Sequence, residues 1–282
     1  MRTKCIVLSW MLIIASMSWG QQYTGIEGLI HIPTADMDTV GMARIGAQYM
    51  PKQMIPDAMK CDGKKFNSCS NYLSVTPFKW VSIGYGYTLW KFHKNADSSQ
   101  KTGFYTKDRY FSVKLQPLAE DRWWPSIAIG GNDVWGASDK GKSGSNYFRN
   151  YYIAFSKHVN LSGWIIGGHL AYRYWWRDYN HKWNGVVTGI TLQPSFYQPL
   201  RAMVEWDGNG VNVGVDCRLY TWRKRPSLPQ FQLQCALLNG RYFTGGLSLC
   251  VKLLGNSGLF KGKKHSKARE ETPTSPQSFE TM

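Results

Sequence analysis

Residues 81–89, VSIGYGYTL, alternate strictly between apolar side chains and small or polar ones. The odd-numbered positions carry Val, Ile, Tyr, Tyr and Leu, and the even-numbered positions carry Ser, Gly, Gly and Thr. Successive side chains of a β-strand point to opposite faces, so this pattern predicts a strand with one apolar face and one small or polar face. Soluble β-sandwiches and transmembrane barrels both contain such strands, and the connections between the strands distinguish the two.

The same alternation recurs along the chain and predicts about twelve strands, at residues 40–50, 70–77, 79–90, 108–117, 124–132, 148–157, 164–174, 185–193, 200–206, 211–220, 229–238 and 242–253. The connections alternate between long and short along most of the chain, as they do in transmembrane β-barrels. We therefore expect an all-β fold, a transmembrane antiparallel up-and-down β-barrel, with the long loops outside and both termini in the periplasm. Short hairpin signals late in the chain allow either a closing meander of four strands or a strand count that differs by two.

The N-terminus has the features of a secretory signal, with Arg2 and Lys4 before a short apolar segment and small residues at 18 and 20. The sequence then divides into a signal peptide (1–20), an extended lead-in or plug segment (21–38), a barrel (39–254) and a disordered basic tail (255–282). A cleaved signal and a barrel predict the cell outer membrane of a Gram-negative organism as the location.

The formal net charge is +16, and removal of residues 1–20 lowers it to about +14, because Arg2 and Lys4 are lost. A basic chain often binds nucleic acid, but export excludes that partner here. Outer-membrane lipid, the phosphates of lipopolysaccharide, an anionic polysaccharide and proteins of a secretion machinery remain as candidate partners. The mature chain keeps five cysteines, and the short loop between Cys61 and Cys69 predicts a disulfide between them in an oxidising compartment.

Charged side chains fall on the face opposite the apolar one, and a lone charge facing lipid costs roughly 2–4 kcal/mol at the membrane midplane. These residues are therefore predicted to face the barrel lumen: Arg44, Lys114, His169, Arg173, Arg201, Glu205, Asp216, Arg218 and Lys252. They could contact an anionic or sugar-like solute. Alternatively they could pair with one another, Glu205 and Asp216 with Arg201 and Arg218, in a filled interior.

The sequence contains no linear catalytic or metal-binding motif. GxSxG, HExxH and P-loop patterns are absent, and the six histidines are scattered. The best catalytic pairing would join His169 to Ser112 or Ser248, but polar lumen residues explain these positions better. We therefore expect no enzyme, no catalytic residues, no metal site and no cofactor.

Two segments resemble a known family. GLIHIPTADMDTVGMARIGAQY (28–49) is similar to the opening of YjbH-type outer-membrane barrel proteins, and EWDGNGVNVGV (205–215) is similar to a late hairpin of the same family. The residues that carry the resemblance are Gly28, Ile32, Pro33, Thr34, Ala35, Glu205, Asp207, Gly208, Asn212 and Gly214. The resemblance implies a reduced, single-barrel member of a family associated with exopolysaccharide.

The expected function is therefore an accessory role in exopolysaccharide production or export. One alternative is a general porin or solute channel. Another is a secreted all-β glycan-binding module that stacks sugars on Trp175, Trp176 and Trp183. If the protein has the accessory role, we expect Pro33 and Thr34 to help to seat the lead-in against the base of the barrel.

Overall fold

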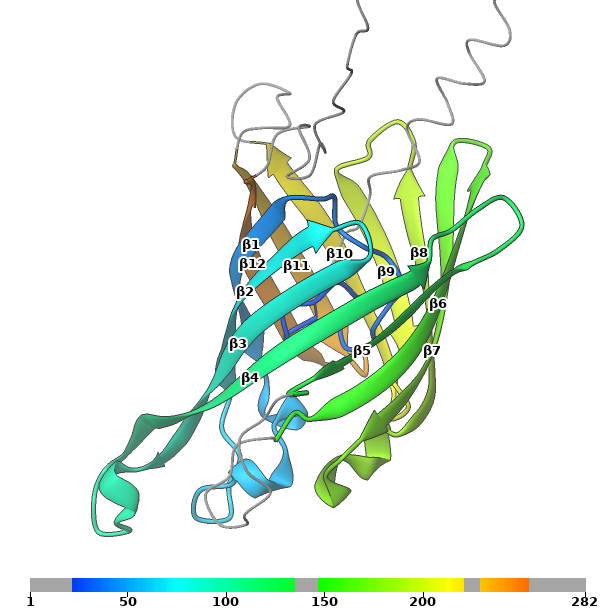
Figure 1. Ribbon diagram of the computed structural model, residues 1–282. Coiled ribbons are helices and arrows are strands. Elements are labelled where there is room, and N and C mark those ends of the chain that lie inside the picture. Colours follow the sequence, from blue (N-terminus) through cyan, green and yellow to red (C-terminus); the bar gives the residue numbers. More distant parts are fainter. Residues whose placement is uncertain (1–21, 135–146, 221–228, 254–282) are drawn as a thin grey trace, which may run out of the picture.

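The chain forms a closed barrel of twelve antiparallel strands (Figure 1). The computed structural model describes residues 22–134, 147–220 and 229–253; the predicted signal peptide and tail lie outside these residues. The strands are β1 (Met42–Met50), β2 (Ser68–Phe78), β3 (Val81–His93), β4 (Thr102–Leu118), β5 (Ser126–Asn132), β6 (Asn150–Leu161), β7 (Trp164–Trp175), β8 (Gly185–Pro194), β9 (Leu200–Trp206), β10 (Val211–Tyr220), β11 (Gln230–Leu238) and β12 (Tyr242–Lys252).

Each strand pairs with the next along the chain, and the first pairs with the last. Ala43 of β1 lies opposite Val75 of β2 on one side and opposite Val251 of β12 on the other, so the sheet has no free edge. The structure confirms the predicted up-and-down barrel and its twelve strands. Closure gives every strand a paired neighbour on both sides, as a wall in contact with lipid requires.

The loop expected at residues 91–107 is the main departure from the predicted strand bounds. β3 continues to His93 and β4 begins at Thr102, so only residues 94–101 connect them, with the short helix η4 (Lys94–Ala96) at the turn. The sequence there is rich in charge, which suggests a loop. However, Phe92 pairs with Gly103 and His93 with Thr102, and this added pairing extends the hairpin beyond its neighbours.

The connections define two ends of the barrel. The short-turn end carries the connections at 79–80, 162–163 and 195–199, and the long-loop end carries those at 51–67 and 133–149. Helices η2 (Lys52–Met54), η3 (Asp57–Met59) and η5 (Asp178–Trp183) also lie at the long-loop end. Strands β9 to β12 form a meander with the short connections 207–210 and 239–241 at this end, which settles the two alternatives left by the sequence in favour of the meander.

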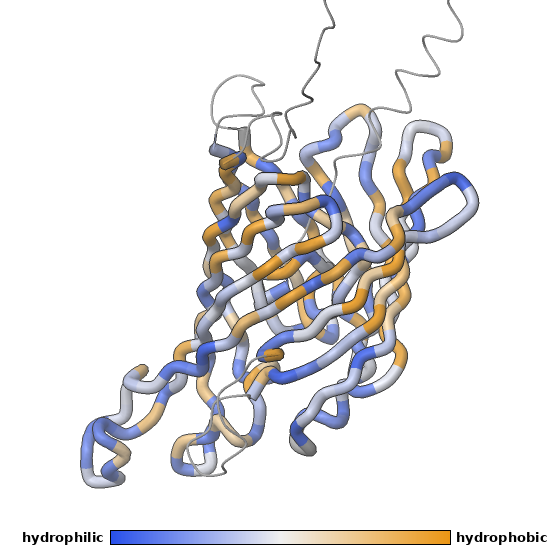
Figure 2. Tube along the Cα trace, viewed as in Figure 1, coloured by the Kyte–Doolittle hydropathy of each residue, from blue (hydrophilic) through white to orange (hydrophobic). Residues whose placement is uncertain are grey.

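The outer surface of the wall is apolar. Side chains on alternate positions point outward and are about half exposed, for example Ile45 at 57%, Leu170 at 48% and Val211 at 51%. Figure 2 shows the resulting alternation of hydrophobic and hydrophilic residues along the strands. An apolar band around a closed barrel is the surface that a transmembrane barrel presents to lipid. Among the described residues, the structure has no helix that is long and apolar enough to cross a membrane.

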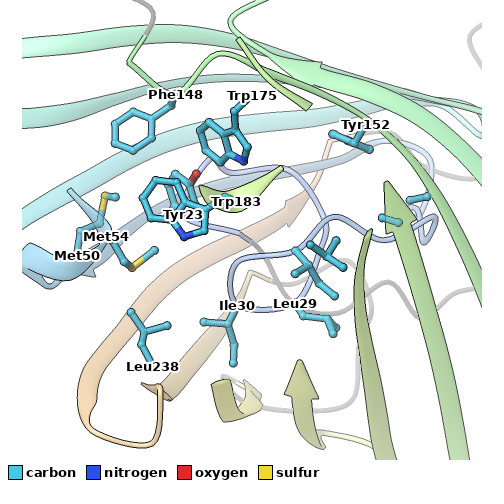
Figure 3. Close-up of a cluster of buried hydrophobic side chains, with 14 of the residues drawn as sticks. Tyr23, Leu29, Ile30, Met50, Met54, Phe148, Tyr152, Trp175, Trp183 and Leu238 are labelled. Carbon is cyan, nitrogen blue, oxygen red and sulfur yellow. The ribbon is translucent and has the colours of Figure 1, made fainter. Parts of the chain in front are cut away.

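The lead-in, of which the structure describes residues 22–38, runs through the interior of the barrel (Figure 1). Leu29, Ile30 and Ile32 are fully buried, with no exposed surface. They belong to a cluster that also contains Tyr23, Trp175 and other buried side chains of the wall (Figure 3). Apolar side chains therefore fill the inside of the barrel as well as covering its outer wall, and the lead-in supplies several of those inside.

Candidate functional site

The centre of the interior is a carboxylate that holds the lead-in backbone. Glu205 of β9 accepts hydrogen bonds from three consecutive backbone N–H groups, those of Ile30 (3.0 Å), His31 (2.8 Å) and Ile32 (3.3 Å). Asn212 of β10 donates its side-chain amide to the same carboxylate at 2.8 Å. Buried donors are costly to leave unpaired. Glu205 therefore satisfies a stretch of backbone that would otherwise be orphaned inside the barrel.

The side chain of His31 forms a second contact beside the first. Its Nδ1 lies 2.8 Å from Asp207 Oδ2, at the start of the β9–β10 hairpin. Burial lowers the pKa of the His31 imidazole, so the neutral ring donates its Nδ1 proton to the carboxylate. Burial alone would raise the pKa of Asp207, but hydrogen bonds from His31 and from the hairpin N–H groups of Asn209 and Gly210 hold that pKa well below its usual range.

Arg173 of β7 ties these parts together. Its guanidinium donates to the carbonyl oxygen of His31 at 2.6 Å and to that of Asp207 at 3.1 Å. We call the set of Glu205, Asp207, Asn212 and Arg173, with the lead-in residues 30–32, the plug lock. The plug lock joins the lead-in to three strands of the wall.

The lead-in is shaped for this contact by a tight turn. The Leu29 N–H donates to the carbonyl oxygen of Ile32 at 3.0 Å, and Gly28 bridges to Pro33. A side chain at Gly28 would meet the Ile32 carbonyl oxygen at 2.6 Å, so this position requires glycine. The turn points three successive N–H groups toward Glu205. Beyond it, Thr34 accepts from the Asp36 N–H and Ala35 donates to Ser156 Oγ of β6.

Small residues of the wall make room for the lead-in. A Cβ at Gly189 of β8 would lie 2.4 Å from Leu29 Cδ1, and one at Gly214 of β10 would lie 3.1 Å from Ile30 Cδ1. The small, inward-facing side of β3 has the same role, since Gly84 faces Ile26. The alternation of apolar and small residues that predicted the strands therefore also leaves space on the inner face of the wall for the side chains of the lead-in.

Aromatic rings enclose His31 on the side of the long loops. Its ring lies 5.4 Å from Tyr23, 6.3 Å from Trp175 and 5.3 Å from Trp183, measured between centroids. Trp175 has no exposed surface and Trp183 has 3%. The expectation that Trp175, Trp176 and Trp183 form a sugar-stacking surface is therefore wrong for two of the three, because these two pack inside the barrel. Only Trp176 is exposed.

The charged residues predicted to face the lumen lie on the inner face of the wall. Lys114 donates to the carbonyl oxygens of Glu27 and Asp36, and Arg44 forms a two-pronged contact with Asp38 at 2.5 Å. Together with Arg173 and Glu205, these residues hold the lead-in. Arg201 pairs with Asp216 at 2.5 Å, as one alternative expected, whereas Glu205 binds backbone instead of an arginine. Arg218 and Lys252 lie half-buried near the short-turn end.

His169 has other partners than those considered from the sequence. Its Nδ1 lies 2.9 Å from Ser156 Oγ and its Nε2 lies 3.2 Å from Thr191 Oγ1. Ser112 instead bonds to Asn132, and Ser248 lies beside Cys250. The pairing with Ser112 or Ser248, which the sequence analysis considered and did not favour, is absent, because the register of β6 against β7 places Ser156 opposite His169. Spacing along the chain gave no indication of that register.

The predicted disulfide is not formed in the structure, where Cys61, Cys69, Cys217, Cys235 and Cys250 are all free. Cys61 lies in a small bridge with Lys64, while Cys69 pairs with Tyr49 across β1 and β2. The two thiols point to different partners: Cys61 Sγ contacts Asp62, and Cys69 Sγ contacts Ser70 and Asn71. Nearness in sequence therefore does not bring them together.

The chain belongs to the YjbH family, described as exopolysaccharide biosynthesis protein YbjH, whose model matches residues 20–167. This range covers the lead-in and the strands β1 to β6. It contains the first of the two segments that resembled the family and ends before the second. No curated protein matches the chain.

Solved structures with a similar fold include the outer membrane phospholipase A from Escherichia coli, with 10% identity, a TM-score of 0.36 and coverage of 77% of this chain and 98% of that one. They also include the Salmonella typhi outer membrane phospholipase dimer with bound calcium, with 10% identity, a TM-score of 0.36 and coverage of 75% and 90%. These values assign no activity to this chain. The expectation that the chain is not an enzyme is corrected: the absence of a linear motif excludes no activity, and the solved structures named above are those of an enzyme.

Proposed function

We propose that this protein is an outer-membrane barrel, exported through a cleaved signal peptide, with an accessory role in exopolysaccharide production or export. Membership of the YjbH family carries the proposal, since that family is described by exopolysaccharide biosynthesis. The apolar outer wall supports a membrane location, because half-exposed aliphatic side chains surround the barrel. The family match includes the lead-in, which is the part of the chain that fills the barrel.

The filled interior supports an accessory role over that of an open conduit. The lead-in is fixed by Glu205, Asp207 and Arg173 and by the charges around Arg44 and Lys114, and the inward aliphatic side chains of the lead-in are fully buried. A general porin needs an aqueous channel, which a barrel of this size lacks once side chains and a plug occupy it. The barrel would then act through its loops or its partners.

The long-loop end offers a surface for an anionic partner. A shallow depression of about 500 Å³ is lined by Tyr49, Lys52, Asn67, Arg241 and Phe243, among others. The rings of Tyr49 and Phe243 are stacked 6.2 Å apart. Aromatic rings beside basic side chains suit sugars that carry acidic groups, either an exopolysaccharide or lipopolysaccharide.

The proposal is tested by measuring cell-bound and released exopolysaccharide in a strain that lacks this protein and in the same strain carrying the full chain. The proposal predicts a loss that the wild-type chain restores. Gly189→Val places a side chain against Leu29, so it should displace the lead-in and restore less exopolysaccharide. Gly168→Val is the matched control, because the nearest atom to a Cβ there is 4.0 Å away.

Both variants are first checked for membrane insertion by fractionation and by a gel shift on boiling. Unchanged exopolysaccharide in the strain that lacks the protein would refute the accessory role. If both inserted variants restore exopolysaccharide equally, the accessory role stands, but it does not require the lead-in to be seated in the barrel.

A further inference from the structure

Three side chains from separate parts of the chain converge near the short-turn end: Asp36 of the lead-in, His158 of β6 and His169 of β7. Asp36 Oδ1 lies 3.9 Å from His158 Nε2, and Asp36 Oδ2 lies 3.8 Å from His169 Nδ1. One ligand atom from each residue lies within 4.8 Å of the other two. We propose that these residues form a binding site for a divalent transition-metal ion of the zinc class, which would fasten the lead-in to the wall.

The donor set fits such an ion. Two imidazole nitrogens and one carboxylate oxygen are common zinc ligands, and other first-row divalent ions bind the same donors. Magnesium and calcium prefer oxygen ligands alone, so they fit less well. In tetrahedral zinc sites with bonds of about 2.0–2.2 Å, neighbouring ligand atoms are about 3.4 Å apart. The distances of 3.9 and 3.8 Å, each to a different oxygen of Asp36, need to contract by about half an ångström. The separations within one set of three ligand atoms reach at most 4.8 Å, so none needs to contract by more than about 1.4 Å.

Neighbouring side chains orient both histidines for this role. Glu120 Oε2 lies 2.8 Å from His158 Nδ1, and Thr191 Oγ1 lies 3.2 Å from His169 Nε2. When these oxygens accept the ring N–H groups, the lone pairs of His158 Nε2 and His169 Nδ1 point into the cluster. Partners of this kind fix the tautomer of metal-binding histidines and increase their basicity.

The carboxylate of Asp36 is the second observation that points to a cation. Its Oδ2 is buried and makes no hydrogen bond within the described part of the chain. The residue is 8% exposed, and the groups nearest to its two carboxylate oxygens are the imidazoles of His158 and His169, at ion-pair and not hydrogen-bond distance. The nearest cationic side chains are engaged with other groups: Lys114 with Glu27 and the Asp36 carbonyl oxygen, and Arg201 with Asp216.

The cluster can also be reached and completed. The His158 side chain is 24% exposed, so an ion can enter from the short-turn end. Ser156 Oγ lies 2.9 Å from His169 Nδ1 and accepts the N–H of Ala35, so its hydroxyl is placed to turn toward the ion as a fourth donor. A bound ion would then connect the lead-in with β6 and β7.

The first test is isothermal titration of Zn²⁺ into the full chain, folded in detergent and stripped with a chelator. We expect one zinc ion per chain, with binding at least tenfold weaker in Asp36→Asn and in His169→Gln. Glu120→Gln should weaken binding by roughly tenfold to a hundredfold, as loss of an outer partner does. His93→Gln is the matched control, because His93 belongs to a different cluster with Cys61 and Asp62. Equal zinc affinity in all variants would mean adventitious binding and would overturn the proposal.

The second test uses the wild-type chain alone and decides the matter if a variant fails to fold. Co²⁺ replaces zinc and absorbs visible light strongly when it is four-coordinate. The proposal predicts those visible bands without the near-ultraviolet band of a cobalt–thiolate bond. Weak bands of hydrated Co²⁺ would overturn the proposal, and so would a thiolate band, which would place the ion at Cys61.

Discussion

Removal of the Glu205 carboxylate is the perturbation that acts most directly on the plug lock. In Glu205→Ala, the backbone N–H groups of Ile30, His31 and Ile32 lose the carboxylate that accepts their hydrogen bonds, and Asn212 loses one partner. Each buried donor left unpaired costs about 1–3 kcal/mol, so the three together cost about 3–9 kcal/mol before water enters. We expect the lower end, about 3 kcal/mol, because water can occupy part of the space left by the side chain.

Hydrogen exchange of the backbone amides measures this effect locally. Since 1.4 kcal/mol corresponds to a factor of ten, a loss of about 3 kcal/mol should speed exchange at residues 30–32 by roughly a hundredfold. Amides in the β3–β4 pairing are the internal control and should be unchanged. Glu205→Gln keeps one acceptor oxygen and should show an intermediate effect. Equal exchange of residues 30–32 in wild type and Glu205→Ala would refute the plug lock.

Three further predictions concern other parts of the barrel. Trp183→Ala should lower the free energy of unfolding by about 3–5 kcal/mol, because the ring is buried, whereas Trp176→Ala should change it by less than about 1 kcal/mol; urea titrations in detergent compare the two. The folded-state pKa of His31 lies below its unfolded value, so the unfolded chain binds more protons and stability should fall as pH decreases below about 6.5. His31→Gln should flatten that part of the pH profile of the urea midpoint, and an unchanged profile would contradict the neutral ring. Arg241→Glu should weaken binding of a labelled anionic polysaccharide to the folded protein without changing its urea midpoint. Equal binding by the variant and the wild type would show that the depression at the long-loop end does not bind the polysaccharide.

Much of the fold can be predicted from the local sequence pattern, whereas the contacts inside the barrel cannot. The period-two alternation of 81–89 and its repeats sets the number, order and faces of the strands, because each strand must turn an apolar side to lipid. The end of β3 and the start of β4 are less predictable. The charges at 91–107 suggest a loop, but pairing between the two strands extends the hairpin into that segment.

The contacts of the plug lock depend on the three-dimensional path of the lead-in. Glu205 and His31 are 174 positions apart, and no spacing rule connects a carboxylate with backbone N–H groups so distant in sequence. The sequence does hold one indication of these contacts. Of the two segments that resemble the YjbH family, 28–49 contains the lead-in residues of the plug lock, and 205–215 contains its wall residues Glu205, Asp207 and Asn212. The partners of His169 and the separation of Cys61 from Cys69 likewise depend on strand register, which pattern alone leaves open.

Whether the lead-in fills the barrel is tested most directly by the current through single wild-type molecules in a planar lipid bilayer. We expect insertion without a steady open-channel conductance, because the plug lock and the buried aliphatic side chains of the lead-in occupy the interior. A stable, ohmic conductance from the folded wild-type chain would contradict a filled interior and would favour a solute channel.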